Sequence, residues 1–331
     1  MNRKSYRIEG VFRLKSPLSH IGETISASSY LVQEHILQET GGTEKVFVYS
    51  GNAWRGQLRD AAARYMLDKL GHDGEPARVG LDTFSLLFSG GKIGGPQTND
   101  IAQARKMRAA VPSIALFGGG VGNQILQGKL RVGNCYPLCR EALPVLPERW
   151  QDVAAKIEYA DCTMEKEHSR RDDAKIEQTR AYLAPPIAGL LGDMGAVKSK
   201  KKSDDDAPPD QMRFRMELVT PGVRLATWIA LDGASEVELG CLVSALHLWS
   251  TAPHIGGQSA RGYGLADLEY EIFDCETGEV VSPFIRVSDG VSLLAAPAQE
   301  AKQAYDQHLR SLYDAALESG RKDALALLGA D

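Results

Sequence analysis

Residues 254–264 read HIGGQSARGYG and place four glycines and one arginine between a long apolar stretch and an alternating one. Glycine has no Cβ, so such a loop lets bare backbone approach another group closely. Backbone N–H groups in a glycine-rich turn can hold a phosphate, and Arg261 adds a positive charge beside them. A tight turn that leads into a strand explains the same residues, so the loop alone leaves both interpretations open.

Clear helix and strand patterns surround this loop. Residues 236–252 predict the most apolar helix, and residues 6–15, 125–132 and 212–218 each alternate apolar and polar side chains as half-buried strands do. The polar positions of these strands include seven basic residues, namely Arg7, Arg13, Lys15, Lys129, Arg131, Arg213 and Arg215. A solvated polar face explains any one strand, but solvated faces normally mix both signs, so the repetition favours a polyanion partner.

A second motif begins with a short predicted strand at residues 46–49. Asn52 is expected to cap a helix at residues 53–70. Arg55 and Arg59 lie one turn apart near the positive end of this helix dipole, where cations do not help helix stability. Either a bound phosphate or a neighbouring carboxylate would offset that cost.

Composition limits the classes of protein. The chain has 331 residues, 43% of them hydrophobic, which is ample for a sizeable core. The net charge is −5, but 13 acidic and only 5 basic residues follow residue 263, so the preceding part carries 30 acidic and 33 basic residues. No apolar run is long enough to span a membrane, no secretory signal opens the chain, and five cysteines do not suggest a disulfide framework. We therefore expect a cytoplasmic protein, and the slightly basic charge of residues 1–263 is compatible with binding of a polyanion.

The mixture of helices and strands predicts an α+β fold. Further helices are expected at residues 81–89 and 143–157, and a glycine-dense turn at residues 116–123. Residues 160–211 are too charged to pack a core and predict a projecting insertion. The last residues, from about 297 to 328, predict amphipathic, acidic helices.

Four motifs occur along the chain in an order that is typical of one family. They are KSPLSHIGE (15–23), SGNAWRGQLRDAAARY (50–65), LFGGG (116–120) and GGQSARGYGLADLEY (256–270). With these four motifs in this order, the chain resembles the RAMP-superfamily backbone subunits of class 1 CRISPR effector complexes. It looks most like the type IV branch. The resemblance implies a ferredoxin-like (RRM-like) palm at residues 1–275 with a glycine-rich loop and an inserted thumb at 160–211, followed by an acidic helical extension at 276–331.

The resemblance also implies a function in antiviral defence. Copies of such a subunit polymerise along CRISPR RNA without catalysis, bind its phosphates and display the guide for pairing with target DNA. Implied partners are further copies, a large subunit, a cap subunit, a crRNA-processing endonuclease and a helicase; no cofactor, metal or membrane is implied. Together with the basic strands, the family motifs indicate the RNA-binding residues His20, Gly22, Ser50, Asn52, Arg55, Arg59, Lys129, Arg131, Arg213, Arg215, Gly256, Gly257, Arg261 and Gly262. Arginine and N–H donors bind phosphate without reading sequence, which is left to base pairing.

Two alternatives stay open. Some relatives cut RNA with an aspartate after the HIG segment, whereas residues 23–45 here hold four glutamates, Glu23, Glu34, Glu39 and Glu44, and no aspartate. Glutamate can bind a divalent ion, and a pair among His20, His35, His168 and His254 could act as acid and base, so a ribonuclease is the first alternative. P-loop and zinc-site spacings are absent. The second alternative is a protein scaffold whose basic strands pair with acidic surfaces without RNA.

Overall fold

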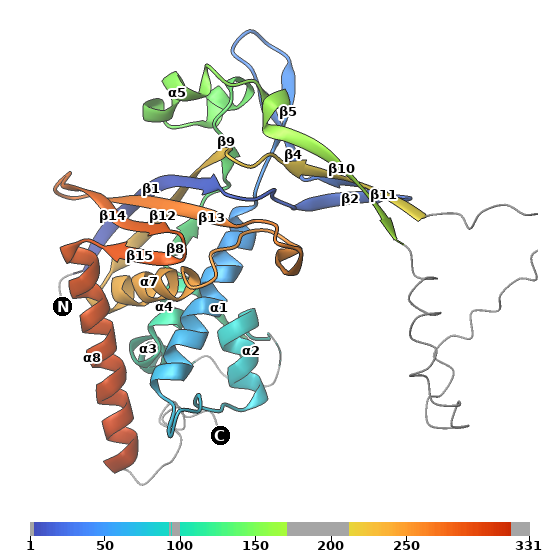
Figure 1. Ribbon diagram of the computed structural model, residues 1–331. Helices are drawn as coiled ribbons and strands as arrows, with labels where there is room; N and C mark the ends of the chain where they lie inside the picture. Colours follow the sequence, from blue (N-terminus) through green and yellow to red (C-terminus); the bar gives the residue numbers. More distant parts are fainter. Residues whose placement is uncertain (1–2, 93, 95–99, 171–211, 319–331) are drawn as a thin grey trace, which may run out of the picture.

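The computed structural model describes residues 3–92, 94, 100–170 and 212–318, and it centres on a seven-stranded antiparallel sheet (Figure 1). Neighbouring strands follow the order β15-β14-β13-β1-β12-β8, and β9 pairs with the first residues of β12. The strands of this main sheet are β1 (Lys4–Leu14), β8 (Leu130–Val132), β9 (Tyr136–Pro137), β12 (Arg224–Ala234), β13 (Ala266–Asp274), β14 (Val280–Ser288) and β15 (Val291–Leu294). The expected α+β class with antiparallel connections is confirmed.

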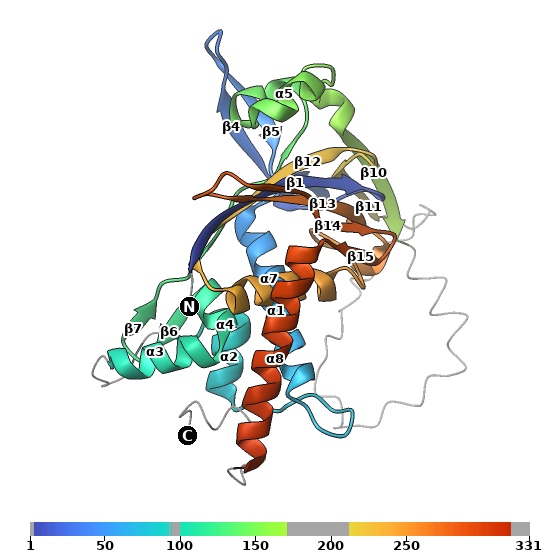
Figure 2. The same ribbon diagram turned by 90° about the vertical axis from the view of Figure 1, so that its left-hand side faces the viewer.

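Helices cover one face of the main sheet (Figures 1 and 2). α1 (Gly51–Lys69) and α7 (Glu236–Trp249) lie directly against it, and α8 (Ala296–Glu318) crosses and packs against α7 (Figure 1). Every second residue of β13 is buried, as expected of a strand with only one face against helices. We call the face turned away from α1 and α7 the outer face.

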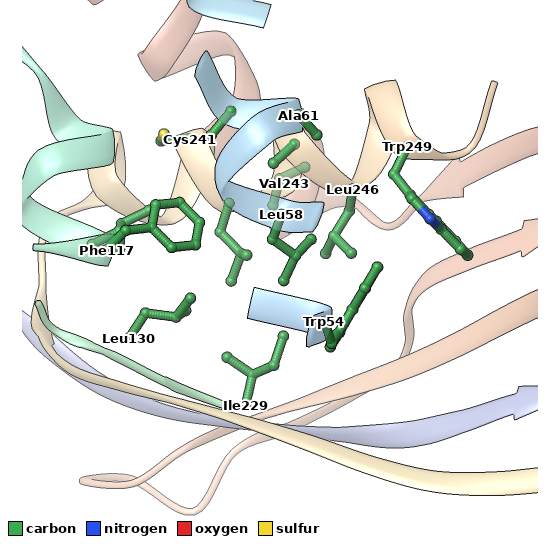
Figure 3. Close-up of a cluster of buried hydrophobic side chains, with 14 of the residues drawn as sticks. Trp54, Leu58, Ala61, Phe117, Leu130, Ile229, Cys241, Val243, Leu246 and Trp249 are labelled. Carbon is green, nitrogen blue, oxygen red and sulfur yellow. The ribbon is translucent and has the colours of Figure 1, made fainter. Parts of the chain in front are cut away.

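Trp54 of α1 is the centre of the core between sheet and helices. Its ring meets Phe12 of β1 and Trp249 of α7 edge-on, with centroid distances of 5.1 Å in both cases. Its indole N–H donates a 3.1 Å hydrogen bond to the Tyr270 hydroxyl of β13. Figure 3 shows Trp54 and Trp249 side by side above the sheet, with Leu58 filling the next position along α1.

Side-chain caps fix the start of both central helices. At α7, the Ser235 hydroxyl accepts from the Glu238 N–H at 3.3 Å and the Glu238 carboxylate accepts from the Ser235 N–H at 2.7 Å, a capping box. At α1, the Ser50 hydroxyl accepts from the Asn52 N–H at 3.2 Å. The predicted cap at Asn52 is therefore wrong by two positions, because Asn52 already lies inside the helix.

The strand predicted at residues 125–132 is two strands. β7 (Gln124–Leu126) forms a hairpin with β6 (Gly119–Val121), whereas β8 joins the main sheet. Gly128 separates them and packs so closely that a Cβ would lie 2.4 Å from the Leu116 carbonyl oxygen. Nearby helices are α2 (Leu81–Ser89), as predicted, α3 (Ile101–Ala110) and α4 (Pro112–Phe117).

A four-stranded sheet projects from one end of the main sheet (Figure 1), and we call it the arm. Its order is β10-β11-β3-β2, and a separate hairpin joins β4 to β5. The strands are β2 (Ile21–Ile25), β3 (Ser28–Leu31), β4 (Gln33–Leu37), β5 (Thr43–Phe47), β10 (Thr163–Arg170) and β11 (Met212–Val219). The strand expected at residues 212–218 is confirmed. Of the thumb expected at 160–211, residues 171–211 lie outside the described residues, so the thumb stays a prediction.

A short helical segment lies over the outer face (Figures 1 and 2). It consists of the 3-10 helix η1 (Arg140–Val145) and α5 (Glu148–Ala154). The single helix predicted at 143–157 is wrong, because Pro144 and Pro147 interrupt regular α-helical hydrogen bonding between the two pieces.

The C-terminal extension differs from its prediction. Within 276–331, residues 280–294 form β14 and β15 and extend the main sheet, and the described helix there is α8. Valines and isoleucine at alternating positions of β14 favour a strand and override the expectation of helix. Within the described ranges, no helix has the length and apolar character needed to cross a membrane.

Candidate nucleic-acid interface

Backbone hydrogen bonds hold residues 254–264, which we call the glycine loop, at the junction of the main sheet and the arm. The Gly257 N–H donates to the Ser19 carbonyl at 2.7 Å, and the Gly264 N–H donates to the Pro17 carbonyl at 2.8 Å. A 3-10 turn, η4 (Ser259–Arg261), lies between these two contacts. Both ends of the loop are therefore fixed to the turn that follows β1.

Two glycines of the loop are required by this close approach. Gly256 has a φ of +74°, and a Cβ there would lie 2.4 Å from the Ser19 carbonyl oxygen. Gly264 has a φ of +78°, and its Cβ would lie 1.9 Å from the Ile255 carbonyl oxygen. Gly257 has no positive φ, and its Cβ would meet only the Ser19 oxygen, at 3.8 Å. The fold therefore requires glycine at positions 256 and 264, whereas a side chain would fit at position 257.

Tyr263 ties the glycine loop to the arm. Its buried ring packs with Met216 and Leu218 of β11. Its hydroxyl lies 3.1 Å from Nε2 of His168, and the Lys166 ammonium lies 5.4 Å from its ring centroid. The glycine loop is therefore held from two sides, by the turn that follows β1 and by β11 of the arm.

The outward side of the loop carries exposed donors that no described carboxylate neutralises. The Arg261 guanidinium is exposed and donates to the Gln258 side-chain oxygen at 3.0 Å, and no described carboxylate pairs with it. The backbone N–H groups of Gln258 and Ser259 have no acceptor within the described residues. Gly262, with a φ of +79°, has open space around its Cα. These donors are available for an external anion.

His20 and the start of α1 lie beside the loop, because His20 follows Ser19 directly. Burial lowers the pKa of His20, which keeps the imidazole neutral, so its Nε2 can accept the Ser50 N–H at 3.4 Å. Its ring packs edge-on against Tyr49 at a centroid distance of 5.0 Å. The structure therefore brings His20, Ser50, Asn52 and the glycine loop into one neighbourhood.

A groove of about 300 Å³ separates the loop from α1. One wall is a face of α1, with Gln57, Asp60 and Arg64, and the other holds His254, Gly256 and Ser259 of the glycine loop. Burial raises the pKa of Asp60. Sequence reasoning missed Arg64, although its spacing of seven residues from Gln57 is the signal that places both on one helical face.

Arg55 and Arg59 lie on a different face of α1. Both donate to the Phe117 carbonyl at the C-terminus of α4, Arg59 at 2.8 Å, and burial lowers the pKa of both guanidinium groups. Successive helical residues are about 100° apart, so the Arg55 face is rotated about 200° from the Gln57 face. Two positive charges near the positive end of the α1 dipole are unfavourable, and the negative C-terminal end of α4 offsets this repulsion. Their contact with RNA stays a prediction, which this geometry does not favour.

Replacing Arg59 with alanine is expected to lower the free energy of unfolding by about 1–3 kcal/mol, because it removes a charged donor from the α4 terminus. Arg64→Ala removes the same charge from an exposed side chain that has no hydrogen bond within the described residues, and should change stability by less than about 0.5 kcal/mol. Urea denaturation of both variants measures the difference. Equal losses would show that the α4 contact has no special role.

The other predicted basic residues do not gather at the groove. The Lys129 ammonium is bound by the Glu238 carboxylate at 2.6 Å and by the Gly233 carbonyl at 2.8 Å, so it stabilises the start of α7 rather than facing solvent. Arg131 is exposed on β8 and pairs with Asp232 at 3.2 Å. On the arm, Arg215 pairs with Glu165 and Arg213 is exposed.

Gly22 lies on the arm and lines a second groove, of about 560 Å³, with Glu23, Tyr30, His35 and Lys45. The glutamates of the ribonuclease alternative do not converge there. Glu34 accepts hydrogen bonds from Asn134 at 3.0 Å and from Tyr136 at 2.5 Å, so its carboxylate supports the β4 hairpin. Burial and this contact raise the pKa of Tyr136 to about 12. Within the described part of the chain, no three His, Cys, Asp or Glu side chains are grouped as metal ligands.

The structure is that of an α+β protein with an antiparallel sheet, helices on one face of that sheet, and a loop that presents free backbone donors. The model of the RAMP superfamily matches residues 12–267, and the chain therefore belongs to that superfamily. A solved structure, "Type IV-B CRISPR Complex", contains a chain with a similar fold, at a TM-score of 0.52 and 18% identity, with 80% of this chain and 90% of that chain covered. No curated protein matches significantly.

Proposed function

We propose that this protein is a non-catalytic backbone subunit of a type IV CRISPR effector complex, where copies polymerise along CRISPR RNA and display the guide to target DNA. Membership of the RAMP superfamily and the fold likeness to a chain of a Type IV-B CRISPR complex support this role. The observation that carries it is the glycine loop, where Arg261 and free backbone N–H groups lie beside the α1 groove.

These donors fit a phosphate backbone rather than base edges. N–H groups and an exposed guanidinium bind phosphate oxygens irrespective of sequence. Arg64 adds a positive charge across the groove, beside the Asp60 carboxylate on the same wall. Sequence recognition would fall to pairing between guide and target. The proposal includes a ferredoxin-like palm, a thumb at 160–211 and assembly in the cytoplasm with a large subunit, a cap subunit, a crRNA-processing endonuclease and a helicase.

Purification from cells that co-express a CRISPR array and the companion subunits tests this function. After mild nuclease trimming, the retained RNA is sequenced. We expect guides from the array with protection at a regular interval, and an Arg261→Glu variant should retain several-fold less RNA because it places a negative charge beside the phosphates.

Two results would contradict the proposal. Protein free of nucleic acid that still forms regular filaments would support the scaffold alternative. Cleavage of the bound RNA that depends on Glu23 or Glu34 would support the ribonuclease alternative. Arg310→Glu, which makes the same change of charge on the exposed side of α8, is the control for an unspecific effect of net charge.

A further inference from the structure

The outer face of the main sheet pairs its arginines with carboxylates. The pairs are Arg7 with Glu9 at 2.7 Å, Arg131 with Asp232 at 3.2 Å and Arg286 with Glu269 at 2.6 Å. The face therefore carries both signs, and the uniformly basic strands expected from the sequence are wrong here. Glu9 lies on β1 itself, whereas Asp232 and Glu269 come from β12 and β13, which the predicted basic strands do not include.

Arg13 and Arg224 are exceptions to this pairing. They lie directly opposite each other in the register of β1 and β12. Neither side chain has an ion pair or hydrogen bond within the described residues. Asp267, the neighbour of Arg13 on β13, lies 3.6 Å from the Lys15 ammonium instead. Like charges opposite each other destabilise a sheet. Asp267 and Glu269 also line this part of the outer face, but their carboxylates pair with Lys15 and Arg286 rather than with Arg13 or Arg224.

The two arginines line a cleft of about 370 Å³ on the outer face, together with Trp150 of α5. The Arg149 guanidinium lies 4.9 Å from the Trp150 ring centroid and anchors α5 to the sheet through Glu9, at 3.5 Å, and Glu271. The indole is therefore held beside the arginine pair by a fixed element. A flat aromatic surface next to two guanidinium groups suits a base joined to a phosphate.

We propose that this Arg13–Arg224 cleft binds one phosphate of single-stranded nucleic acid and that the adjoining base stacks on Trp150. Two adjacent guanidinium groups can share the oxygens of a phosphate, which removes the repulsion between them. A carboxylate from another protein copy would also neutralise the arginines, but it would leave Trp150 without a role. This inference rests on the proposed function, since the ligand is the same class of RNA, and it adds a second contact on the opposite face from the α1 groove.

Binding of a fluorescein-labelled oligouridylate to the full chain, measured by anisotropy over a range of salt, tests the cleft. The cleft variant carries Arg13→Ala and Arg224→Ala together. We expect it to bind about tenfold more weakly and to flatten the salt dependence by about 0.7, because one phosphate is no longer neutralised. Trp150→Leu should weaken binding by a similar factor, about tenfold, whereas Trp150→Phe keeps a stacking surface and most of the affinity.

The control variant carries Arg140→Ala and Arg310→Ala together, which removes the same charge from exposed side chains outside the cleft and the glycine loop. It should bind like the wild type. Thermal unfolding provides an independent measurement, because the cleft variant lacks the like-charge pair and should melt at the same or a higher temperature. A folded cleft variant with weak binding therefore supports the site directly.

The outcomes separate the two proposals. If wild type binds the oligouridylate and the cleft variant matches the control variant in affinity and salt dependence, the cleft inference is overturned and the proposed function stands. The same holds if the cleft variant keeps RNA affinity but no longer self-associates in sedimentation, since the arginines then serve a protein interface. If wild type does not bind RNA even with its companion subunits, both proposals fail.

Discussion

Replacing Trp54 with alanine lowers the free energy of unfolding by about 4 kcal/mol, the largest effect that we expect from a single core substitution. The side chain is fully buried, contacts Phe12 and Trp249 with its ring, and donates to the Tyr270 hydroxyl. Alanine would leave a cavity between α1 and the sheet and a buried hydroxyl without its donor. Urea denaturation followed by circular dichroism measures the loss.

Trp54→Phe separates the two contributions. Phenylalanine keeps most of the ring contacts but cannot donate to Tyr270, whose hydroxyl retains Thr227 at 3.2 Å. We expect a loss of about 1–2 kcal/mol for this variant, well below that of alanine. If both variants lose the same amount, the hydrogen bond rather than the packing of the Trp54 ring determines the stability of this region.

The parts of the fold that sequence could predict are those set by local pattern. The strands β1 and β11 and the helix α1 each bury residues at the period of their own secondary structure, so neighbours along the chain suffice to identify them. The helix α7 is apolar on nearly every side, which is typical of a core helix. The strands at 280–294 escaped prediction because they need a partner. β14 and β15 are stabilised by adding to β13, and that pairing is not visible in their own sequence.

The candidate site was predictable in part for the same reason. The glycine loop was recognisable because positive φ angles require glycine at Gly256 and Gly264. The basic residues were not, because the partner of a charge is a matter of tertiary contact. Lys129 meets Glu238, more than a hundred residues away in sequence, and Arg59 meets a carbonyl of α4. A positive charge at a polar position of an alternating strand therefore indicates neither exposure nor what the charge binds.

Two adjacent glycines distinguish the fold of the loop from its proposed function. Gly256→Ala should lower the free energy of unfolding by about 3 kcal/mol, because alanine is strained at a φ of +74° and its Cβ would overlap the Ser19 carbonyl. Gly257→Ala meets neither obstacle and should change stability by less than about 0.5 kcal/mol. Urea denaturation of both variants tests this contrast, and a large loss at Gly257 would show that the loop is packed differently.

Gly257→Asp then reports on RNA in a loop that still folds. The new carboxylate has room beside the Ser19 carbonyl and would lie close to the free N–H groups of Gln258 and Ser259, where we propose that phosphate binds. Repulsion of about 1 kcal/mol or more at such short range should weaken RNA binding about tenfold, and more at low salt than at high salt. Gly257→Asn has the same shape without the charge and should bind nearly as the wild type. Equal affinity of the aspartate and asparagine variants would show that no phosphate approaches the loop, and the α1 groove would then lose its place in the proposed function.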